Sequence, residues 1–321
     1  MKKNMLITGG AGFIGSFLSE ELLKRGYSVC AVDNLSTGKL ENIAHLRKDP
    51  DFELVTGTIM NKELMEDLVA RAETVFHLAA AVGVRLIIER PVETIETNIL
   101  GTEIIYKLVN KHKKKVMITS TSEIYGKNNE IPFKETADSV YGPTIKSRWS
   151  YACSKAIDEF LGFAYHHEKK LPLIIVRLFN TIGPRQTGAY GMVVPTFVQQ
   201  ALLGHPITVF GDGEQKRCFA NVKDVVGAMA ELAETPDAIG EVFNIGTTEM
   251  VSIKELALRV KKLCNSDSEI VKVPYDKAYE TGFEDMFQRK PDISKIQKLI
   301  GYKPKINLEK TIEEIIDYFK E

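Results

Sequence analysis

A tyrosine and a lysine, Tyr151 and Lys155, stand four residues apart in a stretch with helical periodicity. Residues at this spacing lie on the same face of a helix. An ammonium beside a phenol favours the phenolate and so lowers the pKa of the tyrosine. Tyr151 could then remove a proton from a hydroxyl group as a general base, and Lys155 could also hold the ribose of a cofactor. Because such pairs are common on amphipathic surface helices, this interpretation depends on the rest of the chain.

Hydroxyl groups and one carboxylate follow an apolar run at residues 116–119 that is typical of a strand. They belong to Ser120, Thr121, Ser122 and Glu123. In a parallel sheet, ligands gather at the carboxyl ends of the strands. The sequence therefore places hydroxyls and a carboxylate where a ligand would bind.

Three glycines, Gly9, Gly12 and Gly15, lie between an apolar run at 5–8 and a helical pattern at 17–23. Glycine allows a tight strand-to-helix turn and a close approach of the backbone to a pyrophosphate. The start of the helix then offers free N–H groups and a positive dipole end to the anion. In this strand–turn–helix context, the spacing predicts a dinucleotide-binding loop.

An acidic residue, Asp33, ends the next apolar run at 28–32. This is the place where dinucleotide-binding folds hold a carboxylate against the adenosine ribose. A carboxylate accepts hydrogen bonds from a diol and repels a 2′-phosphate. We therefore expect NAD rather than NADP as the cofactor.

The elements that must position these residues alternate between strand and helix in the first half of the chain. Expected strands are 5–8, 28–32, 52–56, 74–78, 116–120 and 173–177, with helical patterns such as 63–70, 95–110 and 152–166 between them. This rhythm predicts an α/β fold with a Rossmann-type, doubly wound parallel sheet. We expect residues 1–178 to form this domain and 179–321 a smaller mixed α/β substrate domain, with 239–245 returning to the sheet.

Composition excludes several functional classes. The net charge of −1 gives no sign of a nucleic-acid or membrane surface. The four cysteines, Cys30, Cys153, Cys218 and Cys264, are far apart and include no Cys-x-x-Cys pair, which argues against a metal site and a disulfide framework. With no signal peptide and no long apolar span, the sequence favours a cytoplasmic protein.

The chain resembles extended short-chain dehydrogenases/reductases of the nucleotide-sugar epimerase/dehydratase family. The resemblance runs through nearly the whole chain in the family's order. Its motifs are Gly9-x-x-Gly12-x-x-Gly15, Asp33-Asn34-Leu35-Ser36-Thr37-Gly38, His77-Leu78-Ala79-Ala80, Thr97-Asn98, Thr121-Ser122-Glu123-x-Tyr125-Gly126, Tyr151-x-x-x-Lys155, Arg177-Leu178-Phe179-Asn180 and Gly183-Pro184-Arg185. It implies a tightly bound NAD that oxidises a sugar at C4, a UDP-sugar substrate and a homodimer built from paired helices.

The resemblance also implies roles for individual residues. Tyr151 would be the base, Lys155 its partner, and Thr121 or Ser122 would hold the sugar hydroxyl, with Glu123 also in the catalytic group. The cofactor residues would be Gly9, Gly12, Phe13, Ile14, Gly15, Asp33, Asn34, Ser36, Thr37, Gly38, Ile59, Leu78, Ala79, Ala80, Asn98 and Ser120, in addition to Tyr151 and Lys155. The substrate residues would be Arg85, Asn180, Arg185, Val194, Arg217 and Arg289.

The reaction that follows oxidation at C4 depends on the neighbours of Thr121. Dehydratases of the family usually carry an Asp-Glu pair where this chain has Ser122-Glu123. A Ser-Glu pair resembles UDP-glucuronate decarboxylases, as do the Arg-Trp-x-Tyr segment before Tyr151 and the segment around Arg289. A 4-keto group lies β to a C6 carboxylate and can accept the electrons that carbon dioxide leaves behind. We therefore expect a UDP-glucuronate decarboxylase.

Other outcomes stay open at this point. Residues 79–85 do not follow the loop of UDP-xylose synthases, and 187–195 resembles an epimerase loop. Arg85 could bind a sugar carboxylate in a UDP-glucuronate 4-epimerase, and UDP-glucose 4-epimerase is a related possibility. A sugar-nucleotide 4,6-dehydratase and a non-catalytic nucleotide-binding protein are the remaining alternatives.

Overall fold

A parallel sheet of seven strands forms the centre of the computed structural model, which describes residues 2–81, 90–188, 192–274 and 286–320. The strands, in sheet order, are β11 (Glu241–Ile245), β6 (Leu173–Leu178), β5 (Lys115–Thr121), β4 (Thr74–His77), β1 (Asn4–Thr8), β2 (Ser28–Asp33) and β3 (Phe52–Thr56). The six strands expected in the first half form to within one residue at each end. The segment 241–245 pairs in parallel with β6 and is an edge strand of the sheet.

Apolar side chains on both faces explain why this sheet is buried. Leu6 and Ile7 of β1 are adjacent in sequence, point to opposite faces and are both inaccessible to solvent. Helices must therefore cover both sides, as is usual for parallel sheets. The expected α/β class and Rossmann-type arrangement are confirmed.

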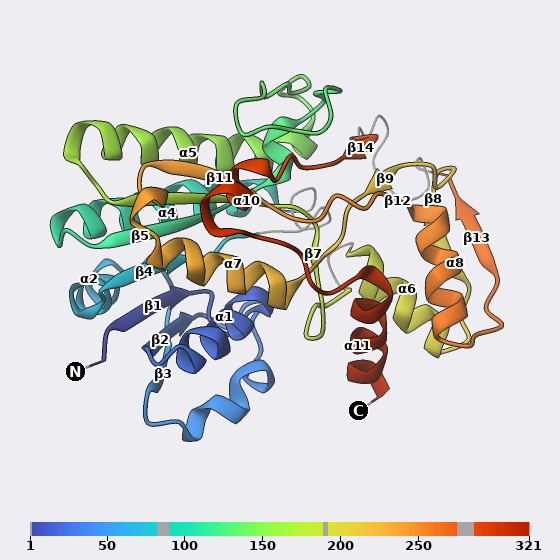
Figure 1. Cartoon of the computed structure of the whole chain (residues 1–321), viewed down its shortest axis with the longest axis horizontal. Coiled ribbons are helices and arrows are strands. Elements are labelled where there is room, and N and C mark those ends of the chain that lie inside the picture. The colour runs from blue at the N-terminus through green and yellow to red at the C-terminus, as the bar shows by residue number, and fades with distance from the viewer. Residues whose placement is uncertain (1, 82–89, 189–191, 275–285, 321) are drawn as a thin grey trace.

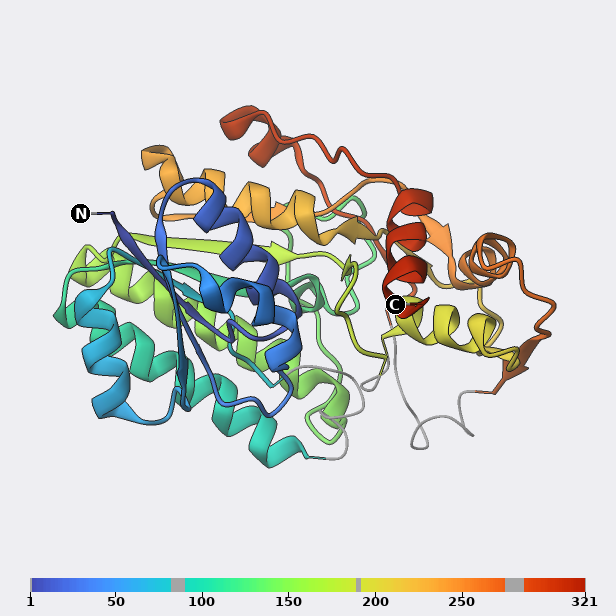
Figure 2. The ribbon, with the colours of Figure 1, turned by 90° about the horizontal axis from the view of Figure 1, so that it is seen from below.

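Two layers of helices cover the sheet (Figures 1 and 2). One face carries α1 (Phe13–Lys24), η1 (Leu40–Lys48), α7 (Val222–Glu234) and α10 (Ser294–Ile300). The other carries α2 (Lys62–Arg71), α4 (Pro91–Lys111) and α5 (Ser150–Lys169). Because α7, α10 and β11 come from the second half of the chain, that half both completes the sheet layers and builds the second lobe.

The second lobe lies beyond the carboxyl ends of the strands and has its own core (Figure 2). It contains α6 (Val193–Leu202), β8 (Ile207–Phe210), α8 (Ile253–Leu263), β13 (Ile270–Val273) and α11 (Leu308–Lys320). Small sheets connect it to the centre: β7 (Thr181–Ile182) with β10 (Ala220–Asn221), and β12 (Val251–Ser252), β9 (Lys216–Arg217) and β14 (Gln288–Arg289) together. A boundary at residue 178 stays a prediction.

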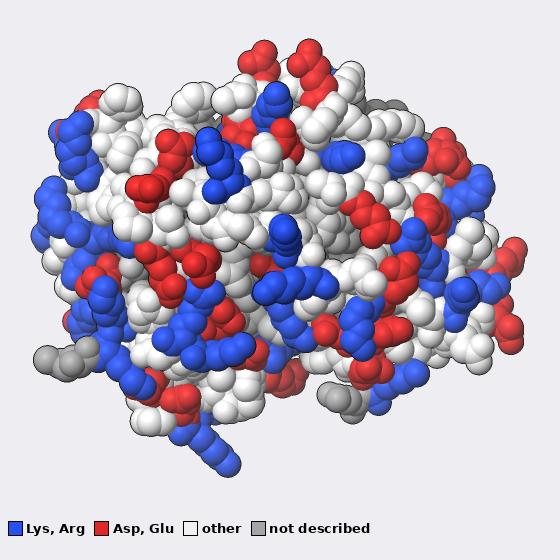
Figure 3. All heavy atoms as spheres, viewed as in Figure 1, with Lys and Arg blue, Asp and Glu red and all other residues white. Residues whose placement is uncertain are grey.

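Charged side chains of both signs are interspersed over the face shown in Figure 3. Among the described residues, no helix combines the length and the apolar character that a membrane crossing requires.

Candidate active site

The glycine loop is packed too tightly for side chains. A Cβ atom on Gly15 would lie 2.2 Å from the Gly9 carbonyl oxygen, and Gly9 itself has a φ of +74°, which favours glycine. Gly12 is the N-cap of α1 and offers no side chain to cap its N–H groups. The start of α1 is therefore open to an anion such as a pyrophosphate.

Asp33 braces this loop through both of its carboxylate oxygens. Its carboxylate accepts hydrogen bonds from the backbone N–H of Ala11 at 2.9 Å and of Leu35 at 2.8 Å. A Cβ on Gly38 would come within 2.8 Å of both carboxylate oxygens, so Gly38 must lack a side chain. Carboxylate oxygens have further lone pairs with which a ribose diol could bond.

Asn34 and Ser36 bond to each other in the turn that follows β2. The Asn34 Oδ1 accepts from the Ser36 backbone N–H at 3.1 Å and from its hydroxyl at 2.8 Å. With Thr37 between them and Gly38, they shape the turn beside Asp33.

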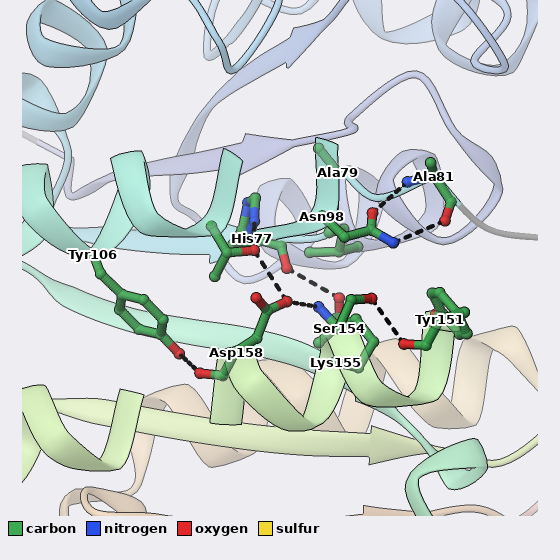
Figure 4. Close-up of polar contacts among 12 residues, drawn as sticks. His77, Ala79, Ala81, Asn98, Tyr106, Tyr151, Ser154, Lys155 and Asp158 are labelled. Carbon is green, nitrogen blue, oxygen red and sulfur yellow. Dashed lines mark hydrogen bonds and ion pairs between the residues drawn. The ribbon is translucent and has the colours of Figure 1, made fainter. Parts of the chain in front are cut away.

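The loop after β4 is held against the glycine loop. The Thr8 hydroxyl accepts from the N–H groups of Leu78 at 3.2 Å and Ala79 at 3.1 Å. The Asn98 amide donates to the Ala81 carbonyl at 3.1 Å and accepts from the Ala81 N–H at 2.8 Å (Figure 4). Asn98 therefore positions the loop, and a direct contact with a cofactor would require it to give up these bonds.

The other apolar residues expected near the cofactor lie in or beside the core. Phe13 and Ile14 are partly buried against the core on the α1 side of the sheet. Ile59 is buried on the α4 side, where a Cβ on Gly101 would lie 2.4 Å from its Cδ1. Ala80 is only partly buried in the loop after β4.

The expected catalytic residues come together where β5 ends. Thr121 leads from β5 into η2 (Ser122–Tyr125), and its hydroxyl accepts from the Glu123 backbone N–H at 3.2 Å. The Thr121 side chain also forms a hydrogen bond with Tyr151, which lies in the first turn of α5. The predicted convergence of β5 and α5 is thus what the structure shows.

Two serines beside Thr121 are buried. Ser122 is almost inaccessible to solvent. The Ser120 hydroxyl is buried and has no hydrogen-bond partner among the described residues. Because a buried hydroxyl normally has a partner, this unpaired group suits a bound polar ligand such as a cofactor.

The prediction that Lys155 lowers the pKa of Tyr151 is wrong for this arrangement. Burial raises the pKa of Tyr151 above its ordinary value, and the charges of Glu123 and Asp158 raise it further. Lys155 instead donates to the Asp158 carboxylate at 2.7 Å, and both side chains are at most 3% exposed (Figure 4). Asp158 balances the ammonium charge that was expected to act on the phenol.

Two arginines hold Glu123. The Arg148 Nη1 lies 2.6 Å from one carboxylate oxygen, and the Arg289 Nη1 lies 3.4 Å from the other. Burial raises the pKa of Glu123, but Arg148 and Arg289 outweigh it and lower that pKa to about 2. Glu123 is therefore ionised at neutral pH.

A third arginine, Arg217, also lowers the pKa of Glu123 through its charge. It lies opposite Arg289 in the parallel pairing of β9 with β14. The short sheet of the second lobe therefore brings two cations of the expected substrate group to a carboxylate at the end of β5.

The family model for GDP-mannose 4,6-dehydratase matches residues 6–315. The chain belongs to this family.

Similar proteins within this family include named decarboxylases and a 4-epimerase of UDP-sugars. A UDP-N-acetyl-α-D-glucosaminuronate decarboxylase of Bacillus cytotoxicus is 44% identical over 100% of this chain and 99% of its own length. UDP-glucuronic acid decarboxylase 1 of Arabidopsis thaliana is 36% identical over 98% of this chain and 69% of its own. The crystal structure of a UDP-glucuronic acid 4-epimerase from Bacillus cereus, bound to UDP-glucuronic acid and NAD, aligns with a TM-score of 0.89 and 30% identity, covering 99% of each chain.

The structure places the remaining predicted substrate residues in different surroundings, and their roles stay predictions. Asn180 lies at the end of β6, where its amide donates to the Cys218 carbonyl at 2.9 Å. Arg185 packs on α1, where its guanidinium lies 2.6 Å from Glu20 and 4.2 Å from the centre of the Phe17 ring. Arg185 is therefore held by α1, the helix that follows the glycine loop.

Val194 and Arg85 complete the list. The Val194 side chain is fully buried in the core of the second lobe, so only its backbone at the start of α6 could meet a substrate. Arg85 lies outside the described residues. Within the described ranges, no cluster of histidine, cysteine or acidic side chains is arranged to hold a metal ion.

Sequence reasoning missed two residues of the site, Arg148 and Asp158. Arg148 stands three residues before Tyr151, within a segment that was already noted, but was not assigned a role. Asp158 stands three residues after Lys155, a helical spacing that predicts contact. Both signals were present in the sequence around α5.

Proposed function

We propose that this protein is an NAD-dependent decarboxylase of UDP-linked hexuronates. The observation that carries the proposal is the pair of arginines, Arg148 and Arg289, on an ionised Glu123 beside Tyr151. Guanidinium groups suit carboxylates and diphosphates because they bind their oxygens in pairs. The family relatives named decarboxylases act on sugars of this type.

NAD fits the residues that would hold it. The glycine loop leaves room for a pyrophosphate, and the Asp33 carboxylate keeps lone pairs for a ribose diol. The Ser120 hydroxyl, which has no hydrogen-bond partner in the described part of the chain, suits a polar ligand. Bound NAD⁺ would accept a hydride from C4 of the sugar, return it later, and supply a positive charge that favours the Tyr151 phenolate.

The chain's own residues then carry the proton and position the sugar. Tyr151 takes the proton of the C4 hydroxyl as the hydride leaves, and Thr121 orients that hydroxyl. The resulting ketone is β to the C6 carboxylate. When the C5–C6 bond breaks, its electron pair enters the C4–C5 enolate, carbon dioxide leaves, and C5 takes up a proton.

Glu123 distinguishes this reaction from dehydration. A 4,6-dehydratase needs an acid that protonates the leaving hydroxyl at C6. With its pKa lowered to about 2, Glu123 holds no proton to give at neutral pH. Ser122 occupies the position of the missing acid, and it cannot serve as one.

A second candidate function is 4-epimerisation of a UDP-hexuronate. It is supported by the likeness to the Bacillus cereus epimerase that was crystallised with UDP-glucuronic acid. It would use the same Tyr151 and the same arginines, but the C5–C6 bond would survive.

We further propose a homodimer formed by α4 and α5 and a cytoplasmic location. Phe160 is 74% exposed, Ile157 49% and Leu100 42% on these neighbouring helices. Such an apolar face is typical of an interface. All four cysteines are free, which fits a reducing compartment.

A substrate comparison tests the proposed function. Purified protein with NAD is incubated with UDP-glucuronate and with UDP-N-acetylglucosaminuronate, and proton NMR identifies the products. We expect a UDP-pentose from the preferred substrate, with a higher kcat/KM for the 2-acetamido sugar because the relative at 44% identity is named for it. A 4-epimer that keeps C6, or no product from either sugar, would refute decarboxylation.

A further inference from the structure

A buried chain of hydrogen bonds runs from Lys155 into the sheet. Lys155 Nζ and the Thr102 hydroxyl both donate to Asp158 Oδ2, at 2.7 and 3.1 Å. His77 lies between two hydroxyls, with Nε2 3.1 Å from Thr102 Oγ1 and Nδ1 2.8 Å from Thr8 Oγ1. All these side chains are buried, and they join α5, α4, β4 and β1; Figure 4 shows Lys155 and Asp158 of α5 facing His77 of β4.

The direction of these hydrogen bonds is fixed at the Thr8 end. The Thr8 hydroxyl already accepts the N–H groups of Leu78 and Ala79. A hydroxyl has one hydrogen and two acceptor sites, so that hydrogen must point to His77 Nδ1. His77 is neutral because burial, aided by the charge of Lys155, lowers its pKa to about 3.

The position of the proton on His77 sets the direction of the remaining hydrogen bonds. A neutral imidazole with a bare Nδ1 carries its proton on Nε2. His77 Nε2 therefore donates to Thr102, and the Thr102 hydroxyl donates to Asp158. Each hydrogen bond in this series is thus donated in the direction of the Asp158 carboxylate, which also accepts a hydrogen bond from the Lys155 ammonium.

We propose that Asp158 is a positioning residue for Lys155: its carboxylate anchors the ammonium and balances its charge beside Tyr151. The carboxylate is itself held by the hydrogen bonds that run from the loop after β4 through Thr8, His77 and Thr102. The inference rests on the proposed function, in which Tyr151 and Lys155 act in oxidation at C4. An ammonium has three hydrogens. Asp158 takes one and leaves two for the tyrosine and a cofactor ribose.

The charged groups around Tyr151 give the sign of the effect. Glu123 and Arg148 face it from η2 and from η3 (Ser147–Trp149), and Asp158 and Lys155 from α5. Burial is the largest cause of the raised Tyr151 pKa, and the charges of Glu123 and Asp158 add to it. Removing the Asp158 charge therefore favours the phenolate, and the unbalanced Lys155 ammonium acts in the same direction.

The variant Asp158→Asn tests this through the pH dependence of C4 oxidation. The rate of substrate-driven reduction of bound NAD is followed by NADH absorbance in a single turnover. We expect the rising limb of the pH profile to move down by about one pH unit, and Asp158→Glu to restore the original position. An Asp158→Asn profile that coincides with that of the wild type would overturn the proposal.

A matched control separates this effect from lost stability. Glu159 is the next residue on α5, is also buried, and pairs with Arg177 rather than with Lys155. Glu159→Gln should lower stability and leave the pH profile of oxidation in place. If Glu159→Gln shifts the profile as Asp158→Asn does, the effect is structural and the proposal fails.

The His77 tautomer provides a readout that needs no reaction. In protein labelled with nitrogen-15 at histidine, we expect NMR to show His77 neutral with its proton on Nε2, and its resonances to move in Asp158→Asn. A proton on Nδ1, or His77 resonances that Asp158→Asn leaves unmoved, would contradict the relay. If the wild type reduces no NAD with any UDP-sugar, the proposed function fails and the relay is judged on this spectrum.

Discussion

At the scale of single residues, the proposed chemistry depends on how neighbouring groups set the charge of Tyr151 and Glu123. The phenol of Tyr151 is buried, and Glu123 lies between two guanidinium groups. In the proposed oxidation at C4, Tyr151 is the group that takes the proton, and Glu123 keeps its negative charge throughout.

Changing Tyr151 to Phe removes the hydroxyl that we propose takes the C4 proton. We expect reduction of bound NAD by substrate to fall by a factor of about 10² or more, while calorimetry shows binding of the UDP-sugar close to that of the wild type. Oxidation at the wild-type rate would show that another residue is the base.

Changing Glu123 to Gln leaves Arg148 and Arg289 beside a neutral group. We expect most carbon dioxide release to be lost and the free energy of unfolding to fall by about 3 kcal/mol at neutral pH. Because pairing lowers the pKa of Glu123 from 4.5 to about 2, the stabilisation exists above about pH 4.5 and disappears as the pH falls toward 2.

Urea unfolding at neutral pH and near pH 3 measures this difference. The gap between wild type and Glu123→Gln should shrink at the lower pH. Glu231→Gln, which changes an exposed carboxylate paired with Arg25, is the control and should cost less than about 1 kcal/mol. A gap that grows as the pH falls would contradict the pairing.

At the scale of elements, a buried polar network fixes α5 on β6. The Arg177 guanidinium binds the Glu159 carboxylate through Nε at 3.0 Å and Nη2 at 2.7 Å. Its Nη1 donates to the Tyr125 hydroxyl at 2.9 Å, and that hydroxyl donates to Asn244 Oδ1 at 2.7 Å. The network therefore joins α5, which carries Tyr151 and Lys155, to β6, η2 and β11.

Breaking this network on one side should be costly. Arg177→Met leaves the Glu159 carboxylate buried without its partner, and we expect a loss of about 3–5 kcal/mol in the free energy of unfolding. Replacing both residues, with Arg177→Met and Glu159→Leu together, should cost less than the single change. Denaturant unfolding of both variants measures these losses. If the double variant has a lower free energy of unfolding than Arg177→Met, the unpaired Glu159 charge is not the cause of the loss in Arg177→Met.

At the scale of the whole molecule, the exposed apolar face of α4 and α5 predicts a homodimer. Phe160→Glu places a charge where two copies would meet, so light scattering after gel filtration should show monomers in place of dimers. Leu203→Glu, an exposed apolar residue in the second lobe, should leave the dimer intact. A wild type that is monomeric at micromolar concentration would contradict the predicted interface.

The sequence was sufficient for the sheet because its strands are continuous apolar runs such as β1 and β6, which need burial on both faces. It was also sufficient to predict that Tyr151 of α5 lies beside Thr121 at the end of β5. The spacing of Asp158 from Lys155 predicts that the two side chains meet. The sequence did not show that the Thr102 hydroxyl, 56 residues away in the chain, also bonds to Asp158. Nor did it place Arg185 on α1, since that contact depends on how the chain turns after β7.

The most direct test of decarboxylation follows the carboxyl carbon itself. The wild-type protein, with NAD, is given a UDP-hexuronate that carries a carbon label only at C6. We expect the label to leave as carbon dioxide in an amount equal to the pentose formed, and Glu123→Gln to lose most of that release. Label retained at C6 of a UDP-sugar product would contradict the account and make the protein an epimerase.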